Sequence, residues 1–378
     1  MKSRKIIIPI HSSIHQLQLA YGKRLEQVFT RLGHQVALLN LDAEKNPLYL
    51  QAYIEREKAD LLVTIDCGGF ELELLGDDLF YNSLCIPAMH FLVKPPWELA
   101  DFLGQRMNFT MEFYTLYEGD KEFIEKYFKR VPKVHVIPEL VWENDISDEK
   151  EEQSPIDNNA GVAVMSDYIS SSEVMEQINA FPQVFSAIAM EAIQKRECNQ
   201  SLSPWKFLEE YLSKIQFQVN SEEFMSLLLP VNLAFSYQEA VEWESAVNSL
   251  CSNQIPVHFY GSGWRKLEQK MEDIKQKQYL HIETEHSLNY EEMETICNQY
   301  KYILVKDKQE RGMSYTPYIQ GVWNINGKEI WLPLVSGTGD LIETIKNKNM
   351  QINSVHTEEI GQANTWISFL QDELDRIF

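Results

Sequence analysis

Short apolar runs and segments of helical periodicity alternate along the first part of the chain. Lys5–Ile10 is a β-branched apolar run, which is typical of a buried parallel strand. The next apolar residues recur at i, i+3, i+4 and i+7 and predict one face of an amphipathic helix: Leu25, Val28, Phe29 and Leu32. Gly33 is placed to end this helix, and Gln35–Leu41 predicts a second strand. Strand, helix and strand joined by short loops indicate a right-handed βαβ unit.

The alternation continues to about residue 140. Further strands are predicted at Ala59–Ile65, within Ser83–Met89, at Phe113–Tyr117 and at Lys133–Ile137. Helices are predicted at Tyr49–Lys58 and Lys121–Phe128. An order of this kind predicts an open, doubly wound α/β domain.

The middle of the chain has a different pattern. Residues 143–159 are strongly acidic and poor in large apolar side chains, so an exposed linker is expected there. Ala160–Met165 predicts one more strand. From residue 172 to about 251 helical periodicity prevails, and prolines are expected to separate its helices at Pro182, Pro204 and Pro230.

The α/β pattern returns after Asn253. The expected strands are Pro256–Tyr260, Leu280–Glu283, Tyr302–Lys306 and Ile330–Val335, and the expected helices are Trp264–Lys277, Tyr290–Gln299 and Glu358–Ile377. The sequence therefore predicts an α/β protein with two Rossmann-like lobes and a helical connector. The expected domains are 1–165, 166–252 and 253–378.

Charge and composition narrow the classes of function. The 378 residues carry a formal net charge of −22, which argues against binding to a nucleic-acid polymer or to anionic lipid by bulk charge. No apolar run approaches the roughly 18–20 residues of a membrane helix, and the apolar stretch near the start is too short for a signal peptide. The five cysteines are scattered without a CxxC spacing, which indicates neither a disulfide framework nor a zinc site. A location in a reducing cytoplasm is expected.

The most informative local motif is Tyr260-Gly261-Ser262-Gly263-Trp264, where a predicted strand passes into a helix. Glycines at such a point let backbone N–H groups approach a phosphate, but a tight turn without a ligand explains them equally simply. The usual dinucleotide fingerprint after the first strand, the P-loop, HExxH and GxSxG are all missing from the sequence.

Other candidate residues follow predicted strands. Glu310 and Arg311 suit the ribose hydroxyls and the diphosphate of a nucleotide, with Lys306 nearby, or they form a surface ion pair. Asp66 follows Ala59–Ile65 beside two glycines and is placed either for a ligand cleft or for capping a helix. His90 is a candidate general base or a satisfied, half-buried histidine.

Several of these segments resemble a known family. Arg31-Leu32-Gly33-His34-Gln35-Val36 resembles the opening of GT-B glycosyltransferases. Four segments in order resemble the CgeB family, the spore-maturation-protein-like glycosyltransferases: Asp60–Asp66, Val134–Pro138, Ile255–Trp264 and Glu310–Gly312. The sequence departs from that family at Gln309, where the family has His, in Val322–Trp331, which looks like a hairpin insertion, and at Thr365-Trp366, a reduced form of the terminal motif.

The resemblance implies a metal-independent transfer of sugar from a nucleoside diphosphate sugar to a protein or cell-surface acceptor, without another cofactor. The C-terminal lobe would hold the donor through Gly261, Ser262, Gly263, Lys306, Glu310 and Arg311. The N-terminal lobe would bind the acceptor, with Asp66 or His90 deprotonating it if the reaction inverts. The alternatives are a catalytically inactive homologue that acts as an accessory or binding subunit of a partner glycosyltransferase, and a two-lobed small-molecule binding protein.

Overall fold

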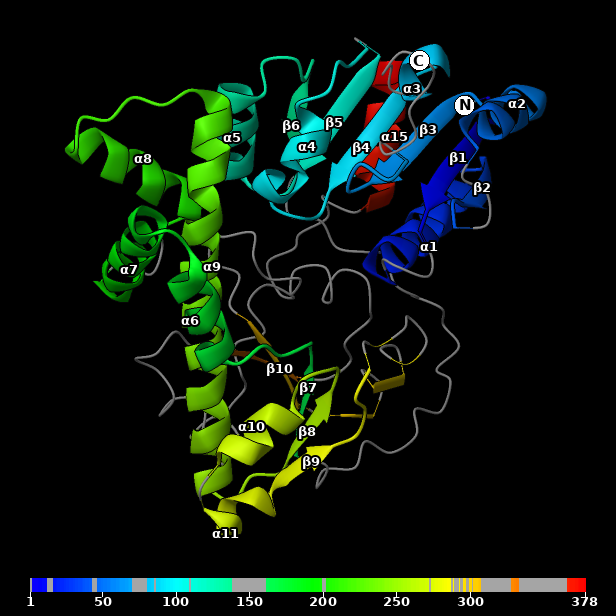
Figure 1. Cartoon of the computed structure of the whole chain (residues 1–378). Helices are drawn as coiled ribbons and strands as arrows, with labels where there is room; N and C mark the ends of the chain where they lie inside the picture. Colours follow the sequence, from blue (N-terminus) through cyan, green and yellow to red (C-terminus); the bar gives the residue numbers. More distant parts are fainter. Residues whose placement is uncertain are drawn as a thin grey trace. The chain divides into compact units, whose positions relative to one another are not determined.

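The computed structural model describes residues 2–11, 16–42, 46–69, 80–84, 86–108, 110–137, 161–198, 202–271, 273–286, 302–306, 328–332 and 366–378, with isolated positions between 288 and 300. The chain divides into two compact units. The first contains the described residues up to Ile137 together with the terminal helix, and the second contains those from Gly161 to Leu332. Figure 1 shows the elements of each.

The first unit contains a parallel sheet of six strands in the order β2-β1-β3-β4-β5-β6. Its strands are β1 (Lys5–Ile10), β2 (Gln35–Asn40), β3 (Leu61–Ile65), β4 (Ala88–Leu92), β5 (Met111–Thr115) and β6 (Val134–Val136). Every residue of β3, β4 and β5 is buried, as expected for central strands covered on both faces. The predicted α/β class with parallel, Rossmann-like strands is confirmed for this unit.

Helices connect these strands. They are α1 (Gln16–Arg31), α2 (Pro47–Glu57), α3 (Phe80–Leu84), the 3₁₀ helix η1 (Pro96–Leu99), α4 (Ala100–Leu103) and α5 (Glu118–Tyr127). Local sequence fixes the ends of α2, because Asn46 accepts a hydrogen bond from the N–H of Leu48 and Lys58 takes a left-handed conformation after the last turn.

The terminal helix α15 (Trp366–Ile377) belongs to the first unit and not to the C-terminal lobe expected from its position in the chain. Trp366 is buried against Tyr21 of α1 and Phe91 of β4, with ring centroids 5.6 and 5.9 Å apart. The periodicity of a helix shows its apolar face but not its partner, so this placement could not be predicted.

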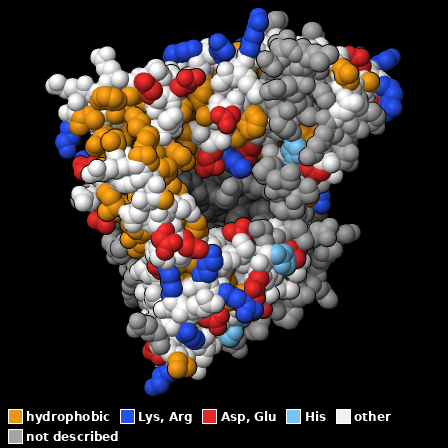
Figure 2. Space-filling model, in the orientation of Figure 1, with side chains coloured by type: hydrophobic (Ala, Val, Ile, Leu, Met, Phe, Trp, Pro, Cys, Tyr) orange, Lys and Arg blue, Asp and Glu red, His pale blue; other side chains and the backbone are white. Residues whose placement is uncertain are grey.

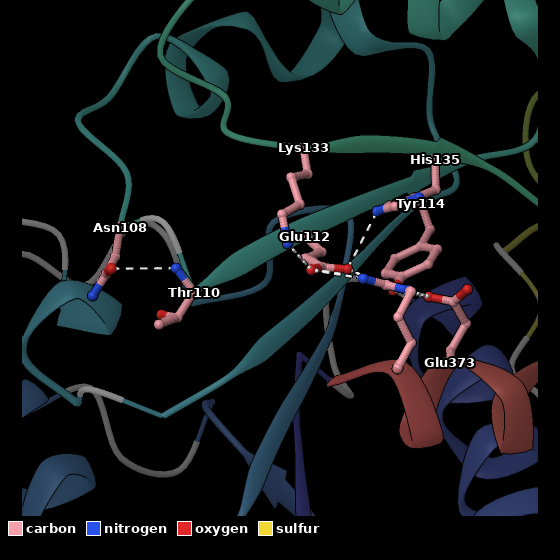
Figure 3. A network of polar contacts seen from close by, with 8 residues as sticks. Asn108, Thr110, Glu112, Tyr114, Lys133, His135 and Glu373 are labelled. Carbon is pink, nitrogen blue, oxygen red and sulfur yellow. Dashed lines mark hydrogen bonds and ion pairs between the residues drawn. The ribbon is translucent and has the colours of Figure 1, made fainter. Parts of the chain in front are cut away.

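A polar network holds the same helix to the sheet, centred on the buried carboxylate of Glu112 on β5 (Figure 3). Arg376 forms a two-pronged ion pair with it, Lys133 Nζ donates to its Oε1 at 2.6 Å, and His135 Nε2 lies 3.2 Å from its Oε2. Tyr114 donates from its hydroxyl to Glu373 of α15 at 2.6 Å. Burial alone would raise the pKa of Glu112, but the hydrogen bonds and charges of Arg376 and Lys133 outweigh it and hold the pKa at about 2.

The second unit contains a parallel sheet in the order β11-β10-β7-β8-β9. Its strands are β7 (Val162–Met165), β8 (Val257–Tyr260), β9 (Leu280–Ile282), β10 (Tyr302–Lys306) and β11 (Lys328–Leu332). Numbered along the chain within this unit, the order reads 3-2-1-4-5, as in Rossmann sheets. One face of the sheet packs Val164, Val257 and Phe259 against Trp243 and Val247 of the long helix α9.

The described helices of this unit are α6 (Ser171–Ala180), α7 (Gln183–Cys198), α8 (Pro204–Lys214), α9 (Ser221–Ser252), α10 (Arg265–Lys270) and α11 (Ile274–Lys277). Capping boxes begin α6 at Ser170 and α9 at Asn220. In Figure 1 the helices α6, α7 and α8 lie beside α9, and the predicted connector forms part of the second unit.

Four expectations need correction. The strand β7, expected at the end of the first lobe, lies in the second sheet between β10 and β8. Pro230 lies inside α9 and does not end it, because the helix buries apolar residues on both sides of the proline. The single helix expected at Trp264–Lys277 is broken at Met271, and Asp273 caps α11. The strand expected within Ser83–Met89 is β4, which lies later, at Ala88–Leu92. Of the expected hairpin in Val322–Trp331, residues 322–327 lie outside the described residues, and β11 pairs parallel with β10.

Within the described part of the chain, no helix has the length and apolar character needed to cross a membrane. Cys67 and Cys251, the cysteines whose state the structure describes, are both buried thiols outside any disulfide. The acidic segment 143–159 and the residues around Glu310 and Arg311 lie outside the described residues.

Candidate functional site

The first sheet reverses its strand order between β1 and β3. In open α/β sheets, ligands bind in the crevice outside the carboxyl ends of the strands at this kind of switch point. The side chains that directly follow the strands here are His11 after β1, Asp42 near the end of β2 and Asp66 after β3. This edge of the first unit is therefore the first candidate site.

Asp66 lies in a strained turn. Both Asp66 and Cys67 have positive φ values, 49° and 56°, and the N–H of Gly68 donates to the carbonyl of Ile65 at 3.0 Å. Two consecutive left-handed residues with this bond form a turn that normally contains Gly, Asn or Asp, so the strain falls on Cys67, at roughly 1–2 kcal/mol. Strain of this kind concentrates at functional sites.

Hydrogen bonds from the residues that follow β4 and from α3 hold this turn in place. The N–H groups of Val93 and Lys94 both donate to Asp66 Oδ1, at 2.6 and 2.7 Å, and the Tyr81 hydroxyl donates to the carbonyl of Gly68 at 2.7 Å. Because the Asp66 carboxylate connects the ends of two neighbouring strands, it stabilises the shape of the sheet edge.

The ionisation of Asp66 is also unusual. Burial raises its pKa to about 6, against the opposing effects of the Lys94 and Val93 N–H groups and of the Lys94 charge. A carboxyl group that titrates close to neutral pH at a sheet edge is a candidate for proton transfer. The structure therefore places this predicted residue where acid–base chemistry is physically reasonable.

His90 has different surroundings. It is the middle residue of β4 and is fully buried, and its Nδ1 lies 2.6 Å from the Thr64 hydroxyl. Its ring stacks on Phe113 with centroids 4.7 Å apart. Burial lowers its pKa to about 3, so the imidazole is neutral at physiological pH. These contacts favour the interpretation of His90 as a histidine of the core, in which Nδ1 is hydrogen-bonded and the buried Nε2 atom is not.

Sequence reasoning missed the pair formed by His11 and Asp42. His11 Nδ1 lies 3.0 Å from Asp42 Oδ1, and both side chains are mostly buried, with 12% and 16% exposed. The signal is present in the sequence, because a histidine directly follows one predicted strand and an aspartate directly follows the next.

Asp120 was also missed. It follows β5 in the first turn of α5 and is buried, and this burial raises its pKa to about 8. It is another buried carboxyl group at the carboxyl end of this sheet and, unlike Asp66, it is mostly protonated at neutral pH.

In the second unit, the predicted glycine turn follows β8 and lies against the segment that follows β7. Gly261 and Gly263 have φ values of 139° and 88°. A Cβ at either position would collide with a backbone carbonyl, that of Ser166 for Gly261 and that of Tyr168 for Gly263. These glycines therefore let two loops approach each other closely. They also adopt a backbone conformation that other residues avoid.

The N–H groups of this turn have partners within the protein. Gly261 N–H donates to Thr284 Oγ1 at 2.9 Å, and both the N–H and the hydroxyl of Ser262 donate to Asp167 Oδ1, at 2.7 and 2.9 Å. The Asp167 carboxylate thus takes the bonds that a phosphate oxygen would accept at this turn.

The switch point of the second sheet lies between β7 and β10. Lys306 is the last residue of β10, and its side chain lies outside the described residues, as do Glu310 and Arg311. No cluster of three or more His, Cys, Asp or Glu side chains among the described residues could hold a metal ion. No protein-family model matches the chain, and a search of curated proteins found no match.

Proposed function

We propose that this protein is a GT-B-like glycosyltransferase that uses a nucleoside diphosphate sugar. The main support is that each unit contains a parallel sheet with its own switch point. In addition, Asp66 lies at the switch point of the first sheet and titrates near neutral pH. The resemblance of the sequence segments to CgeB-like enzymes supplies the substrate class. The proposed acceptor is a protein or a cell-surface glycan.

In this proposal the second unit holds the donor. Gly261, Ser262 and Gly263 lie beside the donor phosphates, while Lys306, Glu310 and Arg311 contact the diphosphate and ribose. A fixed guanidinium and backbone N–H groups stabilise the charge that grows on the departing diphosphate. Because Asp167 now accepts the Ser262 N–H, donor binding requires this carboxylate to give up that bond or the phosphates to lie beside the turn.

The first unit holds the acceptor in this proposal. Its carboxyl edge carries Asp42, Asp66 and His11, which are hydrogen-bonding groups suited to sugar or peptide hydroxyls. Proton removal from the acceptor hydroxyl is assigned to this edge, where Asp66 titrates near neutral pH. Fully buried, His90 has less support for that role.

A second function, that of a catalytically inactive accessory subunit, is favoured by two observations. Asp167 closes the glycine turn with a carboxylate, which opposes an anionic donor. In addition, hydrophobic side chains gather on the visible face over α7–α9 (Figure 2), and Val184, Phe217 and Leu229 are each more than half exposed. An exposed apolar surface of this kind is typical of an interaction with another protein.

Donor binding separates these functions. A panel of nucleotides and nucleotide sugars is screened by thermal shift and calorimetry against the wild type, Arg311→Ala and the exposed control Arg130→Ala. A donor at 100 times its Kd should add about 2.7 kcal/mol to the stability of the unit that binds it. Weaker binding in Arg311→Ala alone would support the proposed donor site, and no binding by the wild type would favour the accessory function.

A further inference from the structure

The strand β2 forms an outer edge of the first sheet. It lies beyond β1 in the strand order, and no other strand of the described residues pairs with it (Figure 1). The N–H groups of Gln35 and Leu41 each donate at 2.9 Å to a carbonyl in β1 or directly before it. Because the pairing direction alternates along a parallel strand, the N–H and C=O groups of Val36 and Leu38 point away from β1. Within the described residues these backbone groups have no partner.

This edge differs from the other outer edges of the two sheets. The strand β2 has six residues, Gln-Val-Ala-Leu-Leu-Asn, without a charge or a proline, and its four apolar residues are all partly exposed. The outer strands β6 and β9 have only three residues each, and β11 begins with Lys328 and Glu329. Short length and charged residues protect a sheet edge from pairing with another chain. Among the outer strands that the structure describes, β2 lacks both protections.

We propose that two copies of this chain pair antiparallel through β2, about a twofold axis at Ala37. Val36 of each copy then lies opposite Leu38 of the other, and the outward N–H and C=O groups exchange about four hydrogen bonds. A twofold axis requires this antiparallel direction, because the same edge meets itself. The pairing joins the two six-stranded sheets into one continuous sheet. This inference does not depend on the proposed function.

The charge of the chain favours a neutral strand as the contact between copies. Each copy has a net charge of −22, so bulk charge opposes association, and the uncharged β2 lets two copies approach with little local repulsion. A foreign peptide that adds a strand is selected by side-chain pockets beside the edge. Leu38 fills the space on the α1 side, since a Cβ on Gly22 would lie 3.5 Å from its Cδ2. Recognition through the main chain, by an identical edge, fits this surface better.

The first test is the mass of the full chain in solution, measured by sedimentation velocity at concentrations up to about 100 μM. The wild type should reach twice 44.1 kDa. Ala37→Lys places like charges opposite each other on the axis and should raise the dissociation constant about 100-fold or more. His281→Lys, the matched control on the outer strand β9, should leave it unchanged. A wild type that stays monomeric, or an unchanged constant in Ala37→Lys, would overturn the proposal.

Amide hydrogen exchange on the wild type locates the interface, and it decides the question even if Ala37→Lys does not fold. The amides of Val36 and Leu38 should be protected in the dimer and lose protection on dilution. Those of Gln35 and Leu41, which are bonded to the β1 side, should stay protected throughout. A dimer in which Val36 and Leu38 exchange rapidly has its interface elsewhere, for example over α7–α9, and would overturn the proposal.

Salt provides a third readout on the same protein. Since the two copies repel through their net charge, added salt should screen this repulsion and increase the dimer fraction. A dimer that salt dissociates would be held by ion pairs, which contradicts pairing through the neutral strand β2.

Discussion

Replacing Glu112 with glutamine should loosen the terminal helix from the first sheet. The pKa of Glu112 lies at about 2, against 4.5 for an unperturbed glutamate, because Arg376 and Lys133 surround its carboxylate. At about 1.4 kcal/mol per unit, this difference corresponds to at most about 3.4 kcal/mol of stability at pH 7. Since the Arg376 and Lys133 side chains are 37% and 53% exposed, solvent screening reduces the expected loss to about 2 kcal/mol.

The pH dependence of this loss has a definite sign. A carboxyl group whose pKa is lowered by folding contributes its full stability above the unfolded pKa, near 4.5, and loses it as the pH falls toward the folded pKa of about 2. The difference between wild type and Glu112→Gln should therefore be about 2 kcal/mol at pH 7 and smaller by about 1 kcal/mol at pH 4.

Amide hydrogen exchange is the suitable assay, because it reports each unit separately. The opening free energies of α15 and β5 should fall in Glu112→Gln, while those of α9 in the second unit stay unchanged. Glu118→Gln is the matched control. The Glu118 side chain is 67% exposed, and its carboxylate forms a long, weak ion pair with Lys121 at 3.8 Å. Equal protection of α15 in wild type and Glu112→Gln at pH 7, or a difference that does not shrink at pH 4, would refute this reasoning.

Three further predictions concern single residues. Burial raises the pKa of Asp120 from 3.8 to about 8, so the wild type loses stability as the pH rises from about 4 to about 8, and Asp120→Asn should raise stability at pH 7 by about 3–4 kcal/mol in urea unfolding. Asp66→Asn keeps the left-handed turn and should remove a loss of stability that the wild type shows as the pH rises through about 6; an unchanged pH profile would contradict this. Gly261→Ala should destabilise the second unit by more than 2 kcal/mol, because its Cβ meets the Ser166 carbonyl, whereas Gly33→Ala meets no atom and should cost about 1 kcal/mol by calorimetry.

Most strands were predicted because their composition is local information, although β4 (Ala88–Leu92) overlaps the expected range Ser83–Met89 only at its start. β1 and β10 lie at the predicted residues, and β3 differs by two residues at its start, since buried β-branched runs bounded by turns have few other interpretations. Which sheet a strand joins is not local. The Val162–Met165 run reads the same in either unit, and only the pairing with β8 and β10 places it in the second.

The candidate site shows the same limit. Asp66 could be found because an aspartate beside two glycines at a strand end is a visible pattern. The engagement of Ser262 by Asp167 could not, because these residues are 95 positions apart and meet only through the parallel pairing of β7 with β8. The role of His90 could not be predicted, because the sequence around a histidine near a strand end is the same whether its side chain faces a ligand or the core.

The most direct test of the proposed function is turnover of the donor. Protein is incubated with each nucleotide sugar that binds, and the released nucleoside diphosphate is measured for the wild type and for Arg311→Ala. The proposal predicts release by the wild type and a large reduction in the variant. A donor that binds and remains intact would contradict catalysis and leave a binding or accessory role, and the absence of any bound donor would contradict the nucleotide-sugar site itself.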